Sequence, residues 1–412
     1  MDTPQQPSAN ALNHPAYVKY IAALLCHSFA AQIMTVAISW QVYDITRDPW
    51  DLGLIGLSQF LPALALVLVT GLVADRFNRR LVMGICLVVE MACALAFLAF
   101  TLTHPTLVWP MFVILAVLGV ARAFMAPSSD ALAPNLLPRE AIPHGISLNS
   151  MAWQLANITG PVAGGLLYGI AGEVAYGTAA LLAGSAVMLV LLIGRTAQGN
   201  RIEETTIHSL LAGFRFIKSE PVVLGAISLD LFAVLLGGAT ALMPVYARDI
   251  LQVDELGLGL LRSAPGVGAV AMALWLSRYG IRDHAGRILF LCVAAFGLST
   301  TVFGVSTWLP LSLLALMLMG AFDMVSVYVR ETLMQLWTPD DVRGRVNAVN
   351  RVFIGASNEL GEFRAGAVAA RLGAVTAVVG GGIGTVAVAA AWSWMFPGLR
   401  TARRLEAPSG HP

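Results

Sequence analysis

The chain has 412 residues, of which 57% are hydrophobic and 12% are charged, and its formal net charge is +1. A soluble domain carries about 25% charged residues, so the composition excludes a soluble domain and indicates an integral membrane protein. Most of the 25 lysine and arginine residues fall in loops that alternate along the chain. This bias predicts that both chain ends are cytoplasmic and that the number of spans is even.

Apolar windows of about 20 residues, long enough to cross a bilayer, recur along the whole chain between polar loops. The predicted spans are 17–43, 52–74, 81–103, 107–127, 144–171, 174–194, 221–247, 255–278, 287–306, 309–332, 344–371 and 373–396. The predicted fold class is therefore an all-α integral membrane protein with twelve transmembrane helices. The four cysteines lie inside these spans without metal-ligand spacing, so no metal site is predicted.

A polar segment, 195–220, divides the chain into equal halves. Within it Ile207, Leu210, Phe214 and Ile217 recur at helical spacing, which predicts an amphipathic helix on the inner membrane surface. The predicted organisation is a cytoplasmic tail at 1–16, a six-helix bundle at 17–194, a cytoplasmic linker at 195–220, a second six-helix bundle at 221–396 and a cytoplasmic tail at 397–412.

The two halves repeat with an offset of about 201 residues. Under this offset Asn157 coincides with Asn358, and Gly160 with Gly361. A repeat of this length indicates two copies of one structural unit. The sequence therefore predicts two pseudo-symmetric six-helix bundles.

The turn between the second and third spans, residues 71–80, reads GLVADRFNRR. It resembles the loop motif of the major facilitator superfamily, although Asn78 takes the place of a glycine. In that superfamily the loop is an inner-side latch, so the resemblance assigns Asp75, Arg76 and Arg79 to gating. We expect Asn78 to preserve the turn because asparagine tolerates left-handed backbone better than most residues.

A narrower resemblance rests on residues 121–127 (ARAFMAP), 160–168 (GPVAGGLLY) and 338–350 (TPDDVRGRVNAVN). Together they look like the bacterial enterobactin-exporter-like branch of the superfamily. The resemblance implies the major facilitator fold and export of small molecules, siderophores or drugs, driven by protons.

Ionisable groups inside membrane helices cost at least about 2.5–3.5 kcal/mol on insertion scales, so they usually face a partner or a wet cavity. Under the repeat offset His27 coincides with Asp230 and Arg122 with Asp323, on spans that line the central cavity in the resembled superfamily. We predict that Arg122 and Asp323 meet as an inner gate. The alternative is that each of them pairs within its own half.

Polar side chains at helical spacing on spans one, five and eleven predict the lining of a substrate cavity, because in lipid they must face protein or water. The candidates are His27, Gln32, Gln154, Asn157, Arg351 and Asn358. The alternative is that some of these polar residues only join neighbouring helices.

A proton carrier needs a carboxyl group that loads and releases a proton near neutral pH. The candidates are Asp230, Asp323, Glu331 and Glu362, with Glu90 and Glu359 as further ones. Asp230 ranks first because no lysine or arginine lies near it in the sequence. The alternative for Asp230 is a hydrogen bond to a neighbouring helix.

No Walker-type nucleotide loop, catalytic triad, zinc site or nucleic-acid surface is recognisable in the sequence. We therefore predict no enzyme activity, no cofactor, no nucleic-acid partner and no use of ATP. The predicted function is secondary export from the bacterial inner membrane by a monomer, with a small molecule and protons as partners. The alternatives are a multidrug or macrolide-type efflux pump and, in another class, a non-transporting sensor or assembly protein.

Overall fold

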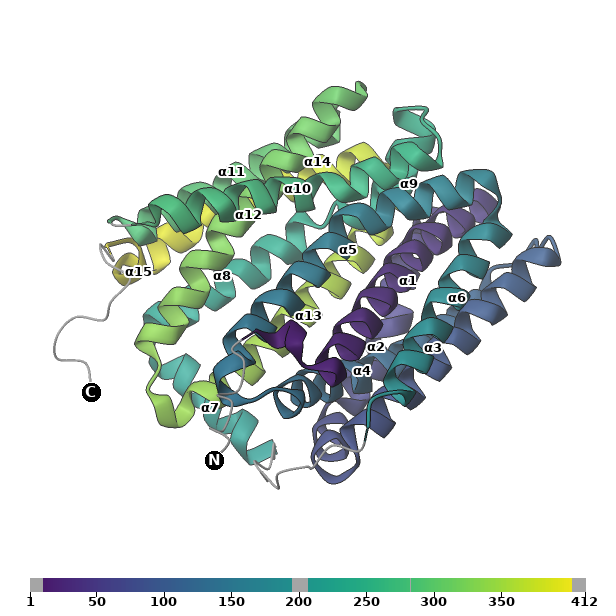
Figure 1. The fold of residues 1–412 in the computed structure, drawn as a ribbon. Helices are drawn as coiled ribbons and strands as arrows, with labels where there is room; N and C mark the ends of the chain where they lie inside the picture. The colour runs from purple at the N-terminus through teal and green to yellow at the C-terminus, as the bar shows by residue number, and fades with distance from the viewer. Residues whose placement is uncertain (1–9, 195–206, 282, 402–412) are drawn as a thin grey trace, which may run out of the picture. The chain divides into compact units, whose positions relative to one another are not determined.

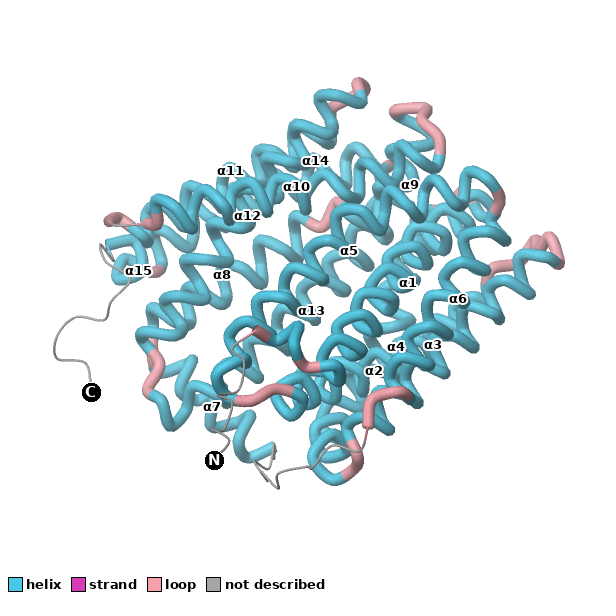
Figure 2. The backbone as a smooth tube through the Cα atoms, viewed as in Figure 1, coloured by secondary structure: helices cyan, strands magenta, loops and turns pink. Residues whose placement is uncertain are grey.

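The computed structural model describes residues 10–194, 207–281 and 283–401. The side chains of Val67, Leu68, Leu72, Ala74, Asp75, residues 207–211, Asp340 and Asp341 lie outside this description. Within the described ranges all regular structure is helical and no strand occurs (Figures 1 and 2). The predicted all-α fold class is confirmed.

The first compact unit takes residues 1–41 and 58–204. Its helices are α1 (Pro15–Thr46), α2 (Pro49–Arg76), α3 (Arg79–Leu102), α4 (Trp109–Leu132), α5 (Ile142–Ile170) and α6 (Gly172–Leu191). Short 3-10 turns, η1 (Ala11–Asn13), η2 (Ala133–Leu136) and η3 (Arg139–Ala141), precede α1 and join α4 to α5. Helix α3 lies beside both α4 and α6, and Met83, Leu87 and Val190 belong to their shared apolar core.

The second unit takes residues 42–57 and 205–412, so it includes the turn between α1 and α2. Its larger helices are α7 (Ile207–Ser219), α8 (Pro221–Gly237), α10 (Glu255–Tyr279), α11 (Ala285–Val305), α12 (Leu309–Trp337), α13 (Asp340–Leu372) and α14 (Ala374–Met395). Shorter ones are η4 (Thr240–Leu242), α9 (Met243–Val245), the π-helix η5 (Tyr246–Ile250) and α15 (Pro397–Thr401).

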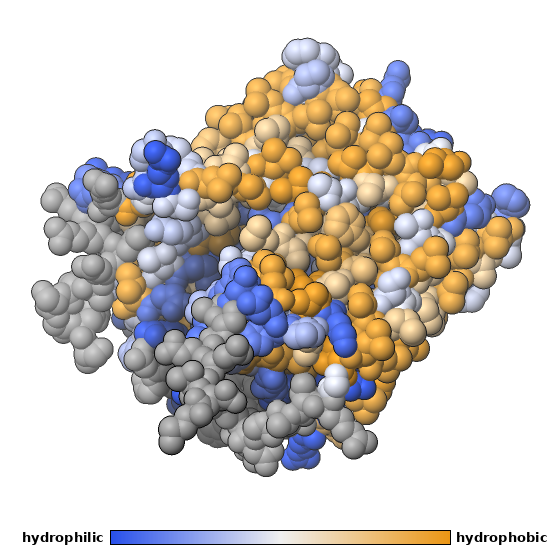
Figure 3. All heavy atoms as spheres, in the orientation of Figure 1, coloured by the Kyte–Doolittle hydropathy of each residue, from blue (hydrophilic) through white to orange (hydrophobic). Residues whose placement is uncertain are grey.

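Large apolar side chains are exposed along the full lengths of the helices. In the first unit Leu181 and Met188 of α6 are 74% and 60% exposed, and in the second unit Leu291 of α11 is 69% exposed. Figure 3 shows apolar atoms along the helices and polar atoms near their ends. Nine helices of the described part are long and apolar enough to cross a membrane. The count of twelve spans stays a prediction.

The seventh predicted span, 221–247, is broken rather than continuous. Helix α8 ends at Gly237, and Gly238 leaves the helical region with ψ 88° before the chain resumes in η4, α9 and η5. Two successive glycines favour a break because glycine loses the most backbone freedom in a helix. The apolar window could not reveal this, because the residues on both sides of the break are hydrophobic.

Arg364 of α13 satisfies the carbonyl groups that the break leaves free. Its guanidinium donates from Nε to the carbonyl oxygen of Leu235 at 2.9 Å, and from Nη2 to that of Leu236. The last carbonyls of a helix have no partner inside the helix, and in lipid each must be bonded within the protein. Arg364 therefore holds the end of α8 against α13.

We expect Arg364→Met to lower the stability of the protein by about 1–3 kcal/mol, because it removes the side-chain donor of the Leu235 and Leu236 carbonyl oxygens. The measurement is thermal unfolding of the purified protein in detergent. Arg364→Lys is the matched control, since it keeps the charge and one donor and should lose less. Equal melting temperatures for wild type and Arg364→Met would contradict this role.

Asn78 keeps the turn between α2 and α3, but by a different mechanism from the one expected. Its backbone is extended, with φ −63° and ψ 111°, and its side chain accepts hydrogen bonds from the amides of Arg80 and Leu81. This makes Asn78 the N-cap of α3, a position that asparagine favours strongly. The expectation of a left-handed backbone is wrong, because Asn78 begins the helix instead of turning the chain.

Helix α7 lies within the predicted linker and packs on the second unit. A Cβ added at Gly213 would lie 2.7 Å from the carbonyl oxygen of Arg345 on α13, so the two backbones approach closely. The rings of Phe214 and Phe353 meet edge to face at 6.4 Å, and Ile217 is buried in a cluster with α8, α12 and α13. The place of α7 relative to the membrane surface stays a prediction.

Candidate functional site

The first unit contains a pocket of about 400 Å³ whose walls are polar and apolar side chains of three helices. Its lining residues are Leu24, His27, Ser28, Ala31 and Gln32 of α1, Arg122, Met125, Ala126, Ser129 and Asp130 of α4, and Trp153 and Asn157 of α5. Within each helix these positions recur every three or four residues, so each helix turns one face to the pocket. Three predicted cavity residues, His27, Gln32 and Asn157, thus lie around one pocket.

A histidine and a glutamate meet at the edge of this pocket. Nδ1 of His27 on α1 lies 2.5 Å from Oε2 of Glu90 on α3. The side chain of Glu90 is 3% exposed and that of His27 is 17% exposed. Both residues were candidates from the sequence, but their contact could not be predicted. They are far apart in the chain, and no shared spacing links them.

The amides of Gln32 and Asn157 join α1 to α5. Nε2 of Gln32 donates to Oδ1 of Asn157, and Gly160, less than one turn further along α5, makes this contact possible. A Cβ at Gly160 would lie 2.7 Å from the Cβ of Gln32. The small residues of the 160–165 run therefore let the polar faces of two helices meet, as small residues do in membrane bundles.

Arg122 of α4 is held by a side chain of α2. Its Nη1 donates to Oε1 of Gln59 at 2.7 Å. Gly119, one turn earlier, brings the helices together, because a Cβ there would lie 2.3 Å from the carbonyl oxygen of Gln59. Asp323 belongs to the second unit, and its meeting with Arg122 as a gate stays a prediction.

In the second unit Asp230 has the partner that the sequence could not show. Arg330 of α12 forms an ion pair with Asp230 of α8, and both residues are buried. Nε of Arg330 also lies 3.9 Å from Oε1 of Glu331, which accepts a hydrogen bond from Asn350 at 3.2 Å. Asp230 is therefore part of a charged network that joins α8, α12 and α13.

Asp323 shares a void of about 10 Å³ with Asp230 and Ser326, a volume close to that of a single water molecule. Glu362 of α13 has Arg262 of α10 as its charged neighbour. A Cβ at Gly56 would lie 3.4 Å from Oε2 of Glu362, so this carboxyl also lies against α2.

The remaining predicted site residues are placed elsewhere. Gln154 does not line the pocket of the first unit, and Arg351 and Asn358 are exposed on α13. The side chain of Asp75 is outside the described part of the chain. The roles of these four residues stay predictions.

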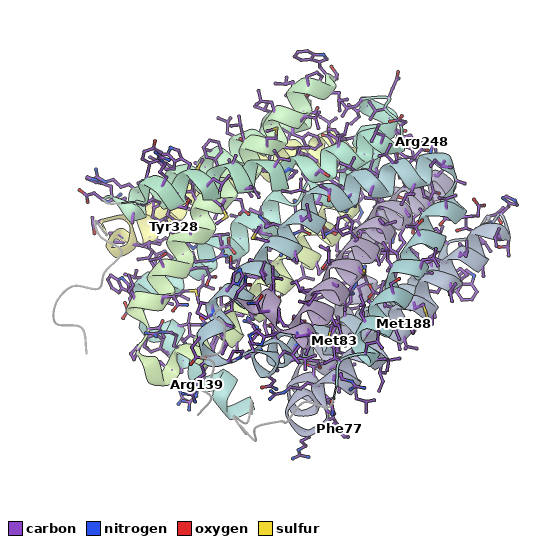
Figure 4. All side chains as sticks on the ribbon, viewed as in Figure 1. Phe77, Met83, Arg139, Met188, Arg248 and Tyr328 are labelled. Atoms are coloured by element: carbon purple, nitrogen blue, oxygen red, sulfur yellow. The ribbon has the colours of Figure 1, made fainter. Side chains whose placement is uncertain are left out.

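Two arginines of the 71–80 turn hold helix ends in the first unit. Arg79 donates to the carbonyl oxygen of Ala131 at 3.2 Å, and Arg80 donates to that of Ile193. Cations are favourable at helix C-termini, where carbonyl groups lack partners. Arg76 is exposed at the end of α2, next to Phe77 at the tip of the turn (Figure 4).

A further cluster of charged residues joins the turn between α1 and α2 to η5. Nη1 of Arg248 lies 2.5 Å from Oδ1 of Asp44, and Nη1 of Arg47 lies 3.6 Å from Oδ1 of Asp249. The hydroxyl of Tyr43 also donates to Asp249. We call these five residues the hairpin cluster; Arg248 is labelled in Figure 4. The sequence missed it, since loop charges are common and their partners cannot be deduced from spacing.

Solved structures share this fold. The nucleoside transporter NupG superposes with a TM-score of 0.71 at 16% identity, over 92% of this chain and 99% of that chain. A bacterial homologue of the human lysosomal transporter Spinster gives a TM-score of 0.68 at 14% identity, over 96% and 98%. These likenesses show that the chain has the fold of these transporters.

Sequence relatives narrow the class. The enterobactin exporters EntS of Shigella dysenteriae serotype 1 and of Escherichia coli O1:K1 are each 27% identical over 345 residues, 82% of this chain and 81% of theirs. The model of the transmembrane secretion effector family matches residues 8–405. The chain belongs to this family. It is a multi-pass membrane transporter of small molecules and not an enzyme, as the sequence predicted.

Proposed function

We propose that this transporter exports a small siderophore-like or drug-like organic molecule across the bacterial inner membrane. The observation that carries the proposal is the pocket of the first unit. It combines the cation Arg122 with the amides of Gln32 and Asn157 and with the ring of Trp153, which is 58% exposed. An aromatic anion such as a catecholate suits these groups, because it can stack on the ring and pair with the guanidinium.

Proton antiport is the energy source we propose, with the protein acting as a monomer with cytoplasmic termini and without ATP. Support comes from the ionisable groups of the membrane helices, which are costly to keep in lipid without a function. The activity of the EntS relatives, enterobactin export, agrees with the outward direction.

Multidrug efflux is the second candidate, favoured by Asp130. This carboxylate and the apolar side chains of Leu24 and Met125 line the same pocket, and together they suit a cationic amphiphile. The two candidates differ in the charge of the molecule that the pocket accepts.

The test is movement of compounds in proteoliposomes with an imposed pH gradient. The panel contains 2,3-dihydroxybenzoate and its serine conjugate as catecholates, and ethidium as a cationic dye. Gradient-dependent movement of a catecholate supports the first candidate, and movement of ethidium alone supports the second. Movement of a compound without dependence on the gradient would contradict proton antiport. No movement of any compound would contradict both candidates and favour a non-transporting sensor or assembly role.

The hairpin cluster provides a further prediction, about gating. We expect Arg248→Glu to reduce transport strongly, because it replaces an attraction to Asp44 by a repulsion from both Asp44 and Asp249. The double variant Asp44→Arg with Arg248→Glu should restore much of the rate. Since the pairs are partly exposed, each neutralisation alone should cost only about 0.2–1 kcal/mol. Proteoliposome transport rates measure these effects, and failure of the double variant to recover would argue against a direct pair.

A further inference from the structure

We propose that His27 and Glu90 together form the proton-binding site of this transporter, with the imidazole relaying protons between the pocket and the buried carboxylate. This inference rests on the proton antiport proposed above. It moves the coupling site from Asp230 in the second unit to a pair in the first unit.

One member of the pair lines the pocket and the other is buried away from it. The imidazole of His27 is one of the groups that line the pocket. Glu90 is not, and its side chain is only 3% exposed. Because Nδ1 of His27 lies 2.5 Å from Oε2 of Glu90, the imidazole connects the pocket to the carboxylate. A proton from water in the pocket can therefore reach Glu90 through the ring.

The carboxylate of Glu90 is incompletely satisfied. Among the described residues its second oxygen, Oε1, is buried without a hydrogen-bond partner. A buried carboxylate is costly unless it is paired and hydrogen-bonded. The hydrogen bond from His27 is therefore the main interaction that offsets the cost of burying the Glu90 carboxylate. The net charge of the pair then depends on a single proton.

The proton balance of the pair is simple. Without the extra proton, Nδ1–H donates to the Glu90 carboxylate, and the pair carries one negative charge. A proton that adds to Nε2 from the pocket makes an imidazolium–carboxylate pair with no net charge; transfer of the Nδ1 proton to Oε2 gives the equivalent neutral form. Release returns the proton to the pocket.

The other titratable and charged groups on the helices around the pair are engaged elsewhere or lie apart from it. On α4, Arg122 is bonded to Gln59 and Asp130 is exposed. On α3, Cys86 and Cys93 flank Glu90, and on α1 Cys26 precedes His27. The packed face of α6 contributes Tyr176, which bonds to Gln41, and its charged residue, Glu173, lies in the first turn. Apart from His27, the ionisable groups that line the pocket are Arg122 and Asp130.

The position of His27 also couples proton to substrate. His27 lines the pocket together with Arg122 and Asn157. A molecule that fills the pocket displaces the water from which His27 takes its proton, so substrate and proton exclude one another. Mutual exclusion at one site is what an antiporter requires. Asp230 is less suited, since it is held in a buried ion pair with Arg330.

The test uses the full chain in proteoliposomes and the compound of the panel above that the wild type moves. Glu90→Gln removes the carboxylate, and His27→Asn keeps a donor to Glu90 but cannot take up a proton. We expect both variants to lose movement driven by the pH gradient and to keep exchange of labelled for unlabelled compound. Glu173→Gln, a neutralisation on α6 outside the pocket, is the matched control and should keep both activities.

Several outcomes would overturn the assignment. Gradient-driven movement that persists in both variants would do so, and so would loss of exchange together with coupling in variants whose melting temperature is unchanged. A second measurement needs no substrate: infrared difference spectra across pH should show a carboxyl band of the wild type that is absent from Glu90→Gln and an imidazole band that is absent from His27→Asn. Identical spectra would overturn the proposal even if a variant folds poorly. If the wild type moves no compound but shows these bands, the proposed export function fails while the proton site stands.

Discussion

Replacing Arg330 with methionine should destabilise the protein by about 3–5 kcal/mol, the usual cost of removing one partner of a buried ion pair. Asp230 is 8% exposed and Arg330 is 3% exposed, so the remaining carboxylate cannot reach water without moving α8. We expect a large fall in melting temperature in detergent and a reduced yield of folded protein.

The double variant Asp230→Asn with Arg330→Met is the control for this prediction. It removes both charges, and it should recover most of the lost stability because a buried neutral pair has no uncompensated charge. Glu331→Gln, on the more exposed side of the same network, should cost much less. Additive losses in the double variant would show that Arg330 stabilises the fold by a route other than its bond to Asp230.

Replacing Gly268 with leucine should prevent the second unit from folding. A Cβ at Gly268 of α10 would lie 1.8 Å from the carbonyl oxygen of Met317 on α12, and one at Gly320 of α12 would lie 2.0 Å from that of Pro265. The two backbones thus touch through reciprocal glycines, and protein interiors are too closely packed to yield by this much. The expected result is aggregation instead of a monodisperse peak in size-exclusion chromatography.

Gly380→Leu on α14 is the matched control, because a Cβ there meets nothing within 4 Å. It carries the same change in volume and in helix propensity, so it isolates the effect of the close approach. Gly268→Ala should lie between the two. A well-folded Gly268→Leu protein would mean that α10 and α12 can separate without loss of the unit.

Most of the fold could be predicted because each transmembrane helix depends on neighbouring residues in the chain. Such helices are recognised by the length of their apolar runs. Glycines mark some of their ends: Gly280 and Gly373 have φ 61° and 87° just after α10 and α13. The break after Gly237 was not predicted, because hydropathy is averaged over many residues and a break in the helix does not change the hydropathy of any of them.

Less of the site could be predicted, because its contacts are not local. Helical spacing predicted Gln32 and Asn157 as cavity residues, and the repeat offset singled out His27. All three line one pocket, and their role in transport stays a prediction. Their partners depend on which helices pack together, which spacing within a helix does not encode. The sequence therefore ranked Asp230 first for lack of a neighbouring arginine, although Arg330 reaches it from a helix a hundred residues later.

Helix α7 has a consequence for dissecting this transporter into separately expressed pieces. Gly213, Phe214 and Ile217 make it an integral part of the second unit. A gene split must therefore fall before Ile207, so that the second fragment carries α7 and keeps Phe353 and Val346 covered. A split after Ser219 would expose the apolar surface of that fragment and would separate α7 from α8 and α13, against which it packs.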